Sequence, residues 1–270
     1  MNDAATILIF RERPHQQLFM VRRHAKSAFM PNAMVFPGGR VDPSDMSLTW
    51  KTQVLEPLTV PRIVAQPDRA HYIAAARETY EEAGILFANR NGQPIDANTP
   101  MGRELFGPCR AALNRSDIGF QDILQRYDLI LDLSRLSYFS RWITPEVEKR
   151  RFDARFFVAE LPPTQSPEFD KLETSEGVWL APKDALALYE QRKIQLAPPT
   201  LRILLTLDHD WSALKRPAKG CYAAIEPQAL FAGDELHLLL PGDLDYRPPG
   251  TERNRIIRRD NHWISVGEGT

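Results

Sequence analysis

The segment from His71 to Ala83 constrains the fold more than any other part of the chain. It is rich in alanine, contains neither proline nor glycine, and is followed by Gly84, a residue suited to the position just after a helix. Ile73, Ala76 and Tyr80 recur at the spacing of one helical face. The sequence therefore predicts a helix over 71–83 with this face buried and Gly84 ending it.

The same helix carries three carboxylates, Glu78, Glu81 and Glu82. At spacings of three and four residues they project from about one face, where like charges repel by a few tenths of a kcal/mol per pair. A solvated acidic surface is one interpretation of such a run. The other is a site for a hard divalent cation, Mg²⁺ or Mn²⁺, which binds carboxylate oxygens and keeps further positions for water and phosphates.

A β-rich region precedes this helix. Residues 6–10 and 17–21 are typical of two strands and predict an opening hairpin. Residues 34–36 form a third apolar run, and Pro37-Gly38-Gly39 follows it. Because glycine gains backbone freedom and proline cannot donate a ladder hydrogen bond, we expect a strand that runs into a loop at this point.

The remainder alternates strand and helix patterns. Residues 46–69 are rich in proline, serine and threonine and are interpreted as an insertion. We expect the last helix to begin only after Pro198-Pro199, with Thr200 as its cap. Helices are predicted at 104–113, 117–127, 182–192 and 201–207, and strands at 85–87, 138–143, 155–160, 178–180, 222–225 and 236–240.

With these residues in view, the chain resembles the Nudix hydrolase family. The signature of that family is a Gly, five residues, a Glu, seven residues, and then Arg-Glu-apolar-x-Glu-Glu-x-Gly-apolar. Residues 77–85 match its second half, with Thr79 in place of the aliphatic residue. Gly38-Gly39 matches its start, Asp45 replaces the first Glu, and about 24 residues are inserted before Arg77. The split signature is similar to the branch that includes coenzyme A diphosphatases.

The resemblance implies an α/β fold, the Nudix α/β/α sandwich with a mixed central sheet. Residues 1–210 would form the Nudix hydrolase domain, with insertions at about 46–69 and, helical in character, at about 100–130. Residues 211–270 would be a C-terminal extension packed on the same domain. The first insertion is a candidate for the pocket that selects coenzyme A.

The resemblance also implies metal-dependent hydrolysis of a pyrophosphate bond in a substrate linked to a nucleoside diphosphate. For this branch the substrate would be coenzyme A or acyl-CoA, giving phosphopantetheine or its acyl form and adenosine 3′,5′-bisphosphate. ADP-ribose, a dinucleotide or a nucleotide sugar are alternative substrates of the same fold. A second alternative is a module that binds nucleotides without turnover, although such modules usually lose the carboxylates that this chain keeps.

Site residues follow from the matched positions. Glu78 and Glu82 correspond to the principal metal ligands of the family, and Glu81 to a further ligand or a water-activating carboxylate. Arg77 corresponds to the arginine that holds a glutamate of the signature by a charge-assisted pair. Gly38 and Gly39 would let the backbone approach the metal or phosphate.

Other side chains are weaker candidates. Arg23 and Arg151 follow predicted strands and are candidates for holding the substrate phosphates, although such charges more often lie on the surface. Trp142 and Phe152 could stack on an adenine ring, but aromatic residues in strands are more often part of the core.

Composition excludes several other classes of protein. Lys plus Arg is 34 and Asp plus Glu is 35, a net charge of -1, so no basic field favours nucleic acid or an anionic membrane. Cys109 and Cys221 are far apart, which argues against a disulfide framework or a zinc site. The sequence contains no run of about 18 apolar residues, so no membrane span is predicted. We expect a cytoplasmic protein with a small nucleotide substrate and, as in many relatives, a possible homodimer.

Overall fold

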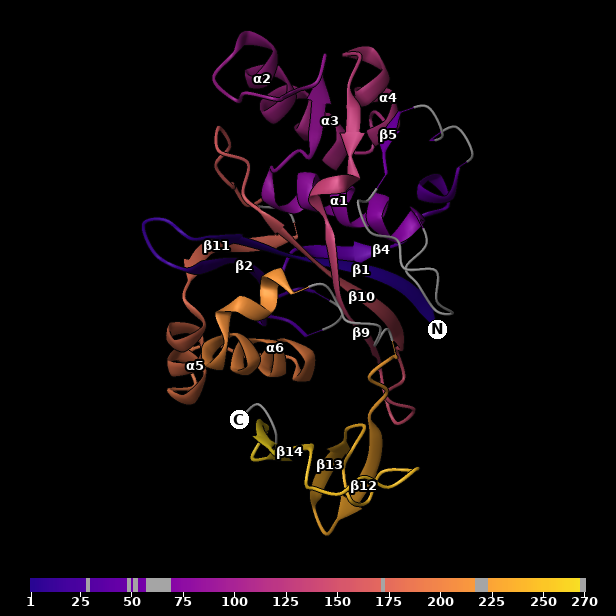
Figure 1. The fold of residues 1–270 in the computed structure, drawn as a ribbon, viewed down its shortest axis with the longest axis vertical. Coiled ribbons are helices and arrows are strands. Elements are labelled where there is room, and N and C mark those ends of the chain that lie inside the picture. The colour runs from indigo at the N-terminus through magenta and orange to yellow at the C-terminus, as the bar shows by residue number, and fades with distance from the viewer. Residues whose placement is uncertain are drawn as a thin grey trace.

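The computed structural model describes residues 1–27, 30–47, 50, 53–56, 69–170, 173–216 and 223–267. Figure 1 shows a central sheet with α1 (Arg69–Ala83) and the short helices up to residue 126 on one face, and α5 (Pro182–Glu190) and α6 (Pro198–His209) on the other. A second, smaller sheet formed by the C-terminal strands lies beyond α6. The predicted arrangement of helices on both faces of a mixed sheet is therefore present.

The central sheet has seven strands in the order β11-β2-β1-β10-β9, with β3 on β2 and β4 on β1. β1 runs parallel to β10 and antiparallel to β2 and β4, which makes the sheet mixed. The strands of this sheet are β1 (Asn2–Arg11), β2 (Gln17–Arg23), β3 (Met34–Val35), β4 (Gly38–Arg40), β9 (Ser137–Ile143), β10 (Phe152–Glu160) and β11 (Thr174–Leu180).

Alternate residues of β1 enter two separate buried clusters. Ile7 and Ile9 pack with α1 (Arg69–Ala83), and Leu8 and Phe10 pack toward α5 (Pro182–Glu190) and α6 (Pro198–His209). Successive side chains of a strand point to opposite faces, so a continuous apolar run such as this one is what a strand covered on both sides requires.

The predicted helix is confirmed as α1. Ile73, Ala76 and Tyr80 are fully buried. Gly84, at φ +65°, ends the helix: its N–H donates to Tyr80 O, and the Ile85 N–H donates to Thr79 O. This is the αL termination expected of a glycine at that position.

The elements between α1 and β9 lie on the α1 side of the central sheet. The helical segments are α2 (Pro100–Glu104), η3 (Leu105–Cys109), α3 (Arg110–Asn114) and α4 (Phe120–Arg126). The strands β6 (Ala88–Arg90), β7 (Gln93–Pro94) and β8 (Ile130–Asp132) form a small sheet with β5 (Val54–Leu55), which precedes α1 in the chain. η3 is a π-helical turn that contains Pro108. Short 3₁₀ helices lie at η1 (Pro43–Met46), η4 (Leu133–Arg135) and η5 (Trp211–Lys215).

The C-terminal sheet has the order β12-β13-β14-β15 and consists of β12 (Gln228–Ala232), β13 (Glu235–Leu239), β14 (Arg255–Arg259) and β15 (His262–Val266). Leu238, Leu240 and Ile256 belong to the same buried cluster as Leu8 and Trp142. The C-terminal strands thus share an apolar core with the central sheet.

Several sequence predictions were wrong in detail. Gly38-Gly39 is not a loop, because it lies in β4, paired with β1. Residues 85–87 form no strand; the Leu86 amide N–H and carbonyl bond the side chain of Gln165 instead of a ladder partner. α6 begins at Pro198 and not after it, since proline is accepted in the first helical turn, where no amide donor is needed.

Other predictions fall partly outside the described residues. Most of the insertion at 46–69 lies there, as do Cys221 and the first residue of the strand predicted at 222–225. Within that last range, Ile225 forms only an isolated bridge to Trp142. In the part of the chain that the structure describes, no helix combines the length and hydrophobicity that crossing a bilayer needs.

Candidate active site

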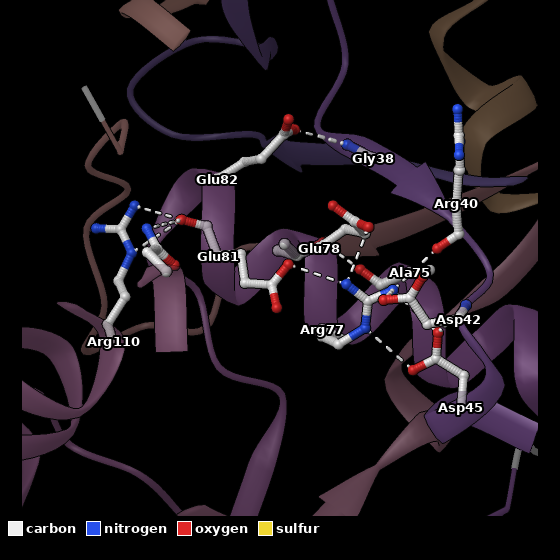
Figure 2. A network of polar contacts seen from close by, with 12 residues as sticks. Gly38, Arg40, Asp42, Asp45, Ala75, Arg77, Glu78, Glu81, Glu82 and Arg110 are labelled. Carbon is white, nitrogen blue, oxygen red and sulfur yellow. Dashed lines mark hydrogen bonds and ion pairs between the residues drawn. The ribbon is translucent and has the colours of Figure 1, made fainter. Parts of the chain in front are cut away.

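The three glutamates lie on the C-terminal half of α1, beside strand β4 (Figure 2). Glu82 is buried and accepts a 2.9 Å hydrogen bond from the Gly38 N–H. The side chains of Glu78 and Glu81 are 14% and 23% exposed. The structure therefore brings Gly38 together with the acidic helix across 44 residues of sequence.

Both glycines of β4 are needed because the backbone is crowded there. A Cβ on Gly38, which has φ +156°, would lie 2.4 Å from Ala5 O. A Cβ on Gly39 would lie 2.4 Å from Glu78 Oε1. Any side chain at either position would displace its neighbour, so glycine is what allows β4 to pass between β1 and the carboxylates.

Arg77 joins the carboxylates into one network. Its Nη1 donates to Glu78 Oε1 at 3.0 Å and to Glu81 Oε2 at 2.9 Å. Its Nε and Nη2 donate to Asp45 at 3.0 and 2.9 Å, and Nη2 also donates to Arg40 O. Asp45, which stands where the signature has a Glu, is buried. Its two charge-assisted hydrogen bonds fix the Arg77 guanidinium in place.

The carboxylates of this network outnumber its positive charges, and burial raises the pKa values of the three glutamates. It raises the pKa of Glu78 to about 8, against the attraction of Arg77, and Glu81 and Glu173 add repulsion. It raises the pKa of Glu81 to about 6, again against Arg77. Burial and the nearby Glu78 raise the pKa of Glu82 well above its ordinary value. One guanidinium does not compensate these carboxylates, so a further cation would be stabilising.

The donor set fits Mg²⁺ or Mn²⁺ chemically, because all three groups are hard carboxylate oxygens. In the described part of the chain, however, no three His, Cys, Asp or Glu side chains are already arranged around a common point for a metal ion. Glu78 and Glu81 turn to Arg77, and Glu82 turns to Gly38. A cation would therefore draw these carboxylates away from their present donors.

Two residues of α3 support the end of α1, and the sequence alone did not identify them. The Glu81 carbonyl accepts from Arg110 Nε at 3.2 Å, Arg110 Nη2 at 3.0 Å and Asn114 Nδ2 at 3.2 Å (Figure 2). The last carbonyls of a helix lack partners within the helix, so these donors hold the turn that carries the carboxylates. No motif marks either residue, since the contact depends on how α3 packs.

A cleft of about 1040 Å³ opens beside the glutamates. Arg23, Gly38, Gly39, Glu78, Glu81 and Glu82 all line it. Arg151 does not; its guanidinium donates to Thr144 O at 2.9 Å and to Glu226 at 2.8 Å. Its neighbour Arg150 lines the cleft instead.

Glu173 is a further acidic residue of the cleft that sequence reasoning missed. It precedes β11, is exposed, and adds to the negative field on both Glu78 and Glu82. A single glutamate in a loop carries no local signal of this placement.

A family sequence model described as the NUDT19 Nudix domain matches residues 64–207, more than half of the chain. The chain belongs to the Nudix hydrolase family. Within it, the match supports the coenzyme A diphosphatase branch. The Nudix signature residues Glu78, Glu81 and Glu82 all fall inside the matched range.

Named relatives agree with this membership. The chain is 30% identical to acyl-coenzyme A diphosphatase NUDT19 of Gallus gallus, over 84% of this chain and 72% of the relative. It is 29% identical to the protein of the same name from Xenopus laevis, over 72% of this chain and 60% of the relative. The matched part thus spans less than two thirds of the Xenopus protein.

Among solved structures, a NUDIX hydrolase from Alicyclobacillus acidocaldarius superposes with a TM-score of 0.66 at 25% identity. The match covers 80% of this chain and 96% of that one. The predicted Nudix fold is therefore confirmed.

Proposed function

We propose that this protein hydrolyses a pyrophosphate bond in coenzyme A or acyl-CoA, releasing (acyl-)phosphopantetheine and adenosine 3′,5′-bisphosphate. The observation that supports this most directly is the surplus of buried carboxylates at a cleft that Gly38 and Gly39 also line. The names of the Gallus and Xenopus relatives favour the coenzyme A substrate over other nucleoside diphosphates.

In this proposal Glu78 and Glu82 hold Mg²⁺ or Mn²⁺, and Glu81 is a further ligand or orients the attacking water. The metal would neutralise charge on the diphosphate, which is the main demand of phosphoryl transfer. Arg77 fixes the carboxylates through its bonds to Glu78 and Glu81, and Asp45 fixes Arg77.

The phosphate contact is assigned to Arg23, which lines the cleft, and not to Arg151, which is bonded to Glu226. The Gly38 N–H bonds Glu82 and so ties β4 to the carboxylates. We further infer that residues 1–210 are the Nudix domain and residues 211–270 an extension of it, since Leu238 and Leu8 share one buried cluster.

The test is direct hydrolysis. Purified protein is incubated with Mg²⁺ or Mn²⁺ and, separately, with coenzyme A, octanoyl-CoA, ADP-ribose and a nucleotide sugar, and the products are separated by chromatography. We expect adenosine 3′,5′-bisphosphate from the two coenzyme A compounds. Consumption of ADP-ribose with coenzyme A left intact would reverse the substrate assignment, and binding without turnover of any compound would show a non-catalytic module.

A further inference from the structure

The cleft beside the glutamates reaches both faces of the central sheet. Near its end β1 pairs with β2, at Phe10 and Arg11, whereas near its start it pairs with β4, at residues 4–6. On this edge of β1 the sheet therefore splits, with β2 at one end of the strand and β4 at the other. The glutamates line the cleft on the α1 face, while Ala4 and Phe156 line it on the face toward α6.

On the α6 face two rows of paired residues form what we call the groove floor. One row runs from Ala4 through Ala154 to Trp142, and the other from Gly38 through Thr6 to Phe156. Neighbouring strands are about 4.8 Å apart, so the floor extends roughly 14 Å from β4 to Trp142 on β9. Gly38, the partner of Glu82, thus stands in the row next to Ala154.

The groove floor has two polar side chains, Thr6 in the second row and Trp142 in the first. Trp142 is only 3% exposed, and its Nε1 has no hydrogen-bond partner among the described residues. A buried N–H without a partner is costly, so a ligand carbonyl reaching it would be stabilising. The two alanines leave depth beside the indole, because their side chains end at Cβ.

The C-terminal extension provides the opposite wall. Leu238 of β13 and Trp263 of β15 line the cleft together with Leu196. Tyr189 of α5 holds this wall in place, since its hydroxyl accepts from the Trp263 N–H at 2.7 Å and donates to Trp263 O at 3.0 Å. The wall combines the apolar Leu196, Leu238 and Trp263 with Arg258, which lies over the Trp263 ring, and His262, which stacks on Tyr189.

We propose that this groove binds the acylated pantetheine arm of the substrate, with a carbonyl of the arm accepting from Trp142 Nε1 and with Leu238 and Trp263 limiting the acyl chain. The proposal rests on the proposed function and assigns the specificity of that site to the C-terminal extension. The adenosine half would then occupy the other end of the cleft.

The test compares octanoyl-CoA with ADP-ribose, which shares the adenosine diphosphate part but lacks the arm. In Ala154→Phe the new ring would fill the groove floor, and we expect kcat/KM for octanoyl-CoA to fall at least ten-fold, with ADP-ribose changed less than two-fold. In Trp142→Phe the N–H donor is lost together with part of the ring volume, and KM for octanoyl-CoA should rise about five-fold with kcat unchanged. Trp211→Phe is the matched control, because Trp211 packs on the same cluster without lining this cleft.

Binding is measured in parallel by calorimetry in a Glu82→Gln background, where turnover does not interfere. An equal loss of affinity for octanoyl-CoA and ADP-ribose in the two groove variants would place the adenosine half in the groove and overturn the proposal. Octanoyl-CoA that binds through Trp142 and Ala154 but is never hydrolysed by the unmutated protein would refute the proposed function and leave the groove assignment standing. No binding of octanoyl-CoA at all would refute both.

Discussion

Two buried arginines, Arg77 and Arg255, each lie among carboxylates, yet their surroundings differ in charge balance. Arg255 forms a two-point bond with Asp243, at 2.8 and 2.6 Å, and also reaches Asp245. Asp243 accepts two backbone N–H groups as well, from Asp245 and Asn254. Burial alone would raise the pKa of Asp243, but these bonds outweigh it and the pKa lies below its usual value.

At Arg77 the balance is reversed. The arginine is shared among Asp45, Glu78 and Glu81, and burial keeps the pKa of both glutamates high. The carboxylate of Asp243 is neutralised by Arg255 and needs no ligand. The carboxylates around Arg77 outnumber the positive charges, so binding a cation would stabilise them. The comparison therefore separates a structural ion pair from a candidate catalytic one, although both are buried arginine clusters.

The largest expected effect is on catalysis at the Arg77 cluster. Glu82→Gln should lower kcat/KM for coenzyme A about a thousand-fold, or ~4 kcal/mol, because a neutral amide is a poor ligand for Mg²⁺. Steady-state kinetics measures this, and circular dichroism should show a folded variant, since the amide has the shape of the carboxyl and its oxygen can still accept from the Gly38 N–H. Activity within a few-fold of the unmutated protein would remove Glu82 from the site.

The second prediction addresses stability at the Arg255 cluster. Arg255→Met should lower the free energy of unfolding by about 3 kcal/mol, because Asp243 is then buried without its counter-ion. Urea unfolding followed by tryptophan fluorescence measures the loss. The folded variant should keep its kcat/KM, since neither Arg255 nor Asp243 lines the cleft. A stability change below about 0.5 kcal/mol would show that the Arg255–Asp243 ion pair is not structural.

The third prediction concerns the space between β4 and α1. Gly39→Ala should lower kcat/KM about thirty-fold, since its Cβ would lie 2.4 Å from Glu78 Oε1 and must displace that carboxylate. Gly107→Ala is the matched control, because a Cβ there meets nothing within 4 Å. Equal activity of the two variants would show that the position of Glu78 is not critical.

The fourth prediction is a pH dependence of stability. Because the pKa of Glu78 rises from an ordinary 4.5 to about 8 on folding, the folded state holds a proton that the unfolded chain releases. Stability without metal should therefore fall as pH rises from 4.5 to 8, and Mg²⁺ should raise Tm by a few degrees more at pH 8.5 than at pH 6. Differential scanning fluorimetry measures both.

The Arg255 cluster should respond to pH in the opposite direction. Because the pKa of Asp243 is lowered on folding, its contribution to the free energy of unfolding is present above an ordinary pKa of 3.8 and is lost as pH falls through the lowered value.

For the Arg77 cluster, a metal-free protein whose stability does not change between pH 5 and 8.5 would contradict the assignment of surplus charge.

The sequence predicted best what depends on local spacing. The helix at 71–83, its end at Gly84 and the common face of Glu78, Glu81 and Glu82 all follow from a 3.6-residue period, and the structure confirms the helix and its end. The opening hairpin of β1 and β2 and the strands β9 and β10 were also predicted to within a few residues. Errors gathered where hydrogen bonds come from distant segments, as at β4 and Leu86.

The sequence by itself thus determined that an acidic helix face exists, because neighbours three and four residues apart are fixed by the helix. Only the tertiary structure decided what that face meets. Asp45 anchors Arg77, Arg110 holds the Glu81 carbonyl, and Ala4, Ala154 and Trp142 align across three strands, whereas Arg151 is directed to Glu226 instead of the cleft. Such contacts depend on the register and packing of segments far apart in the chain, which no local period encodes.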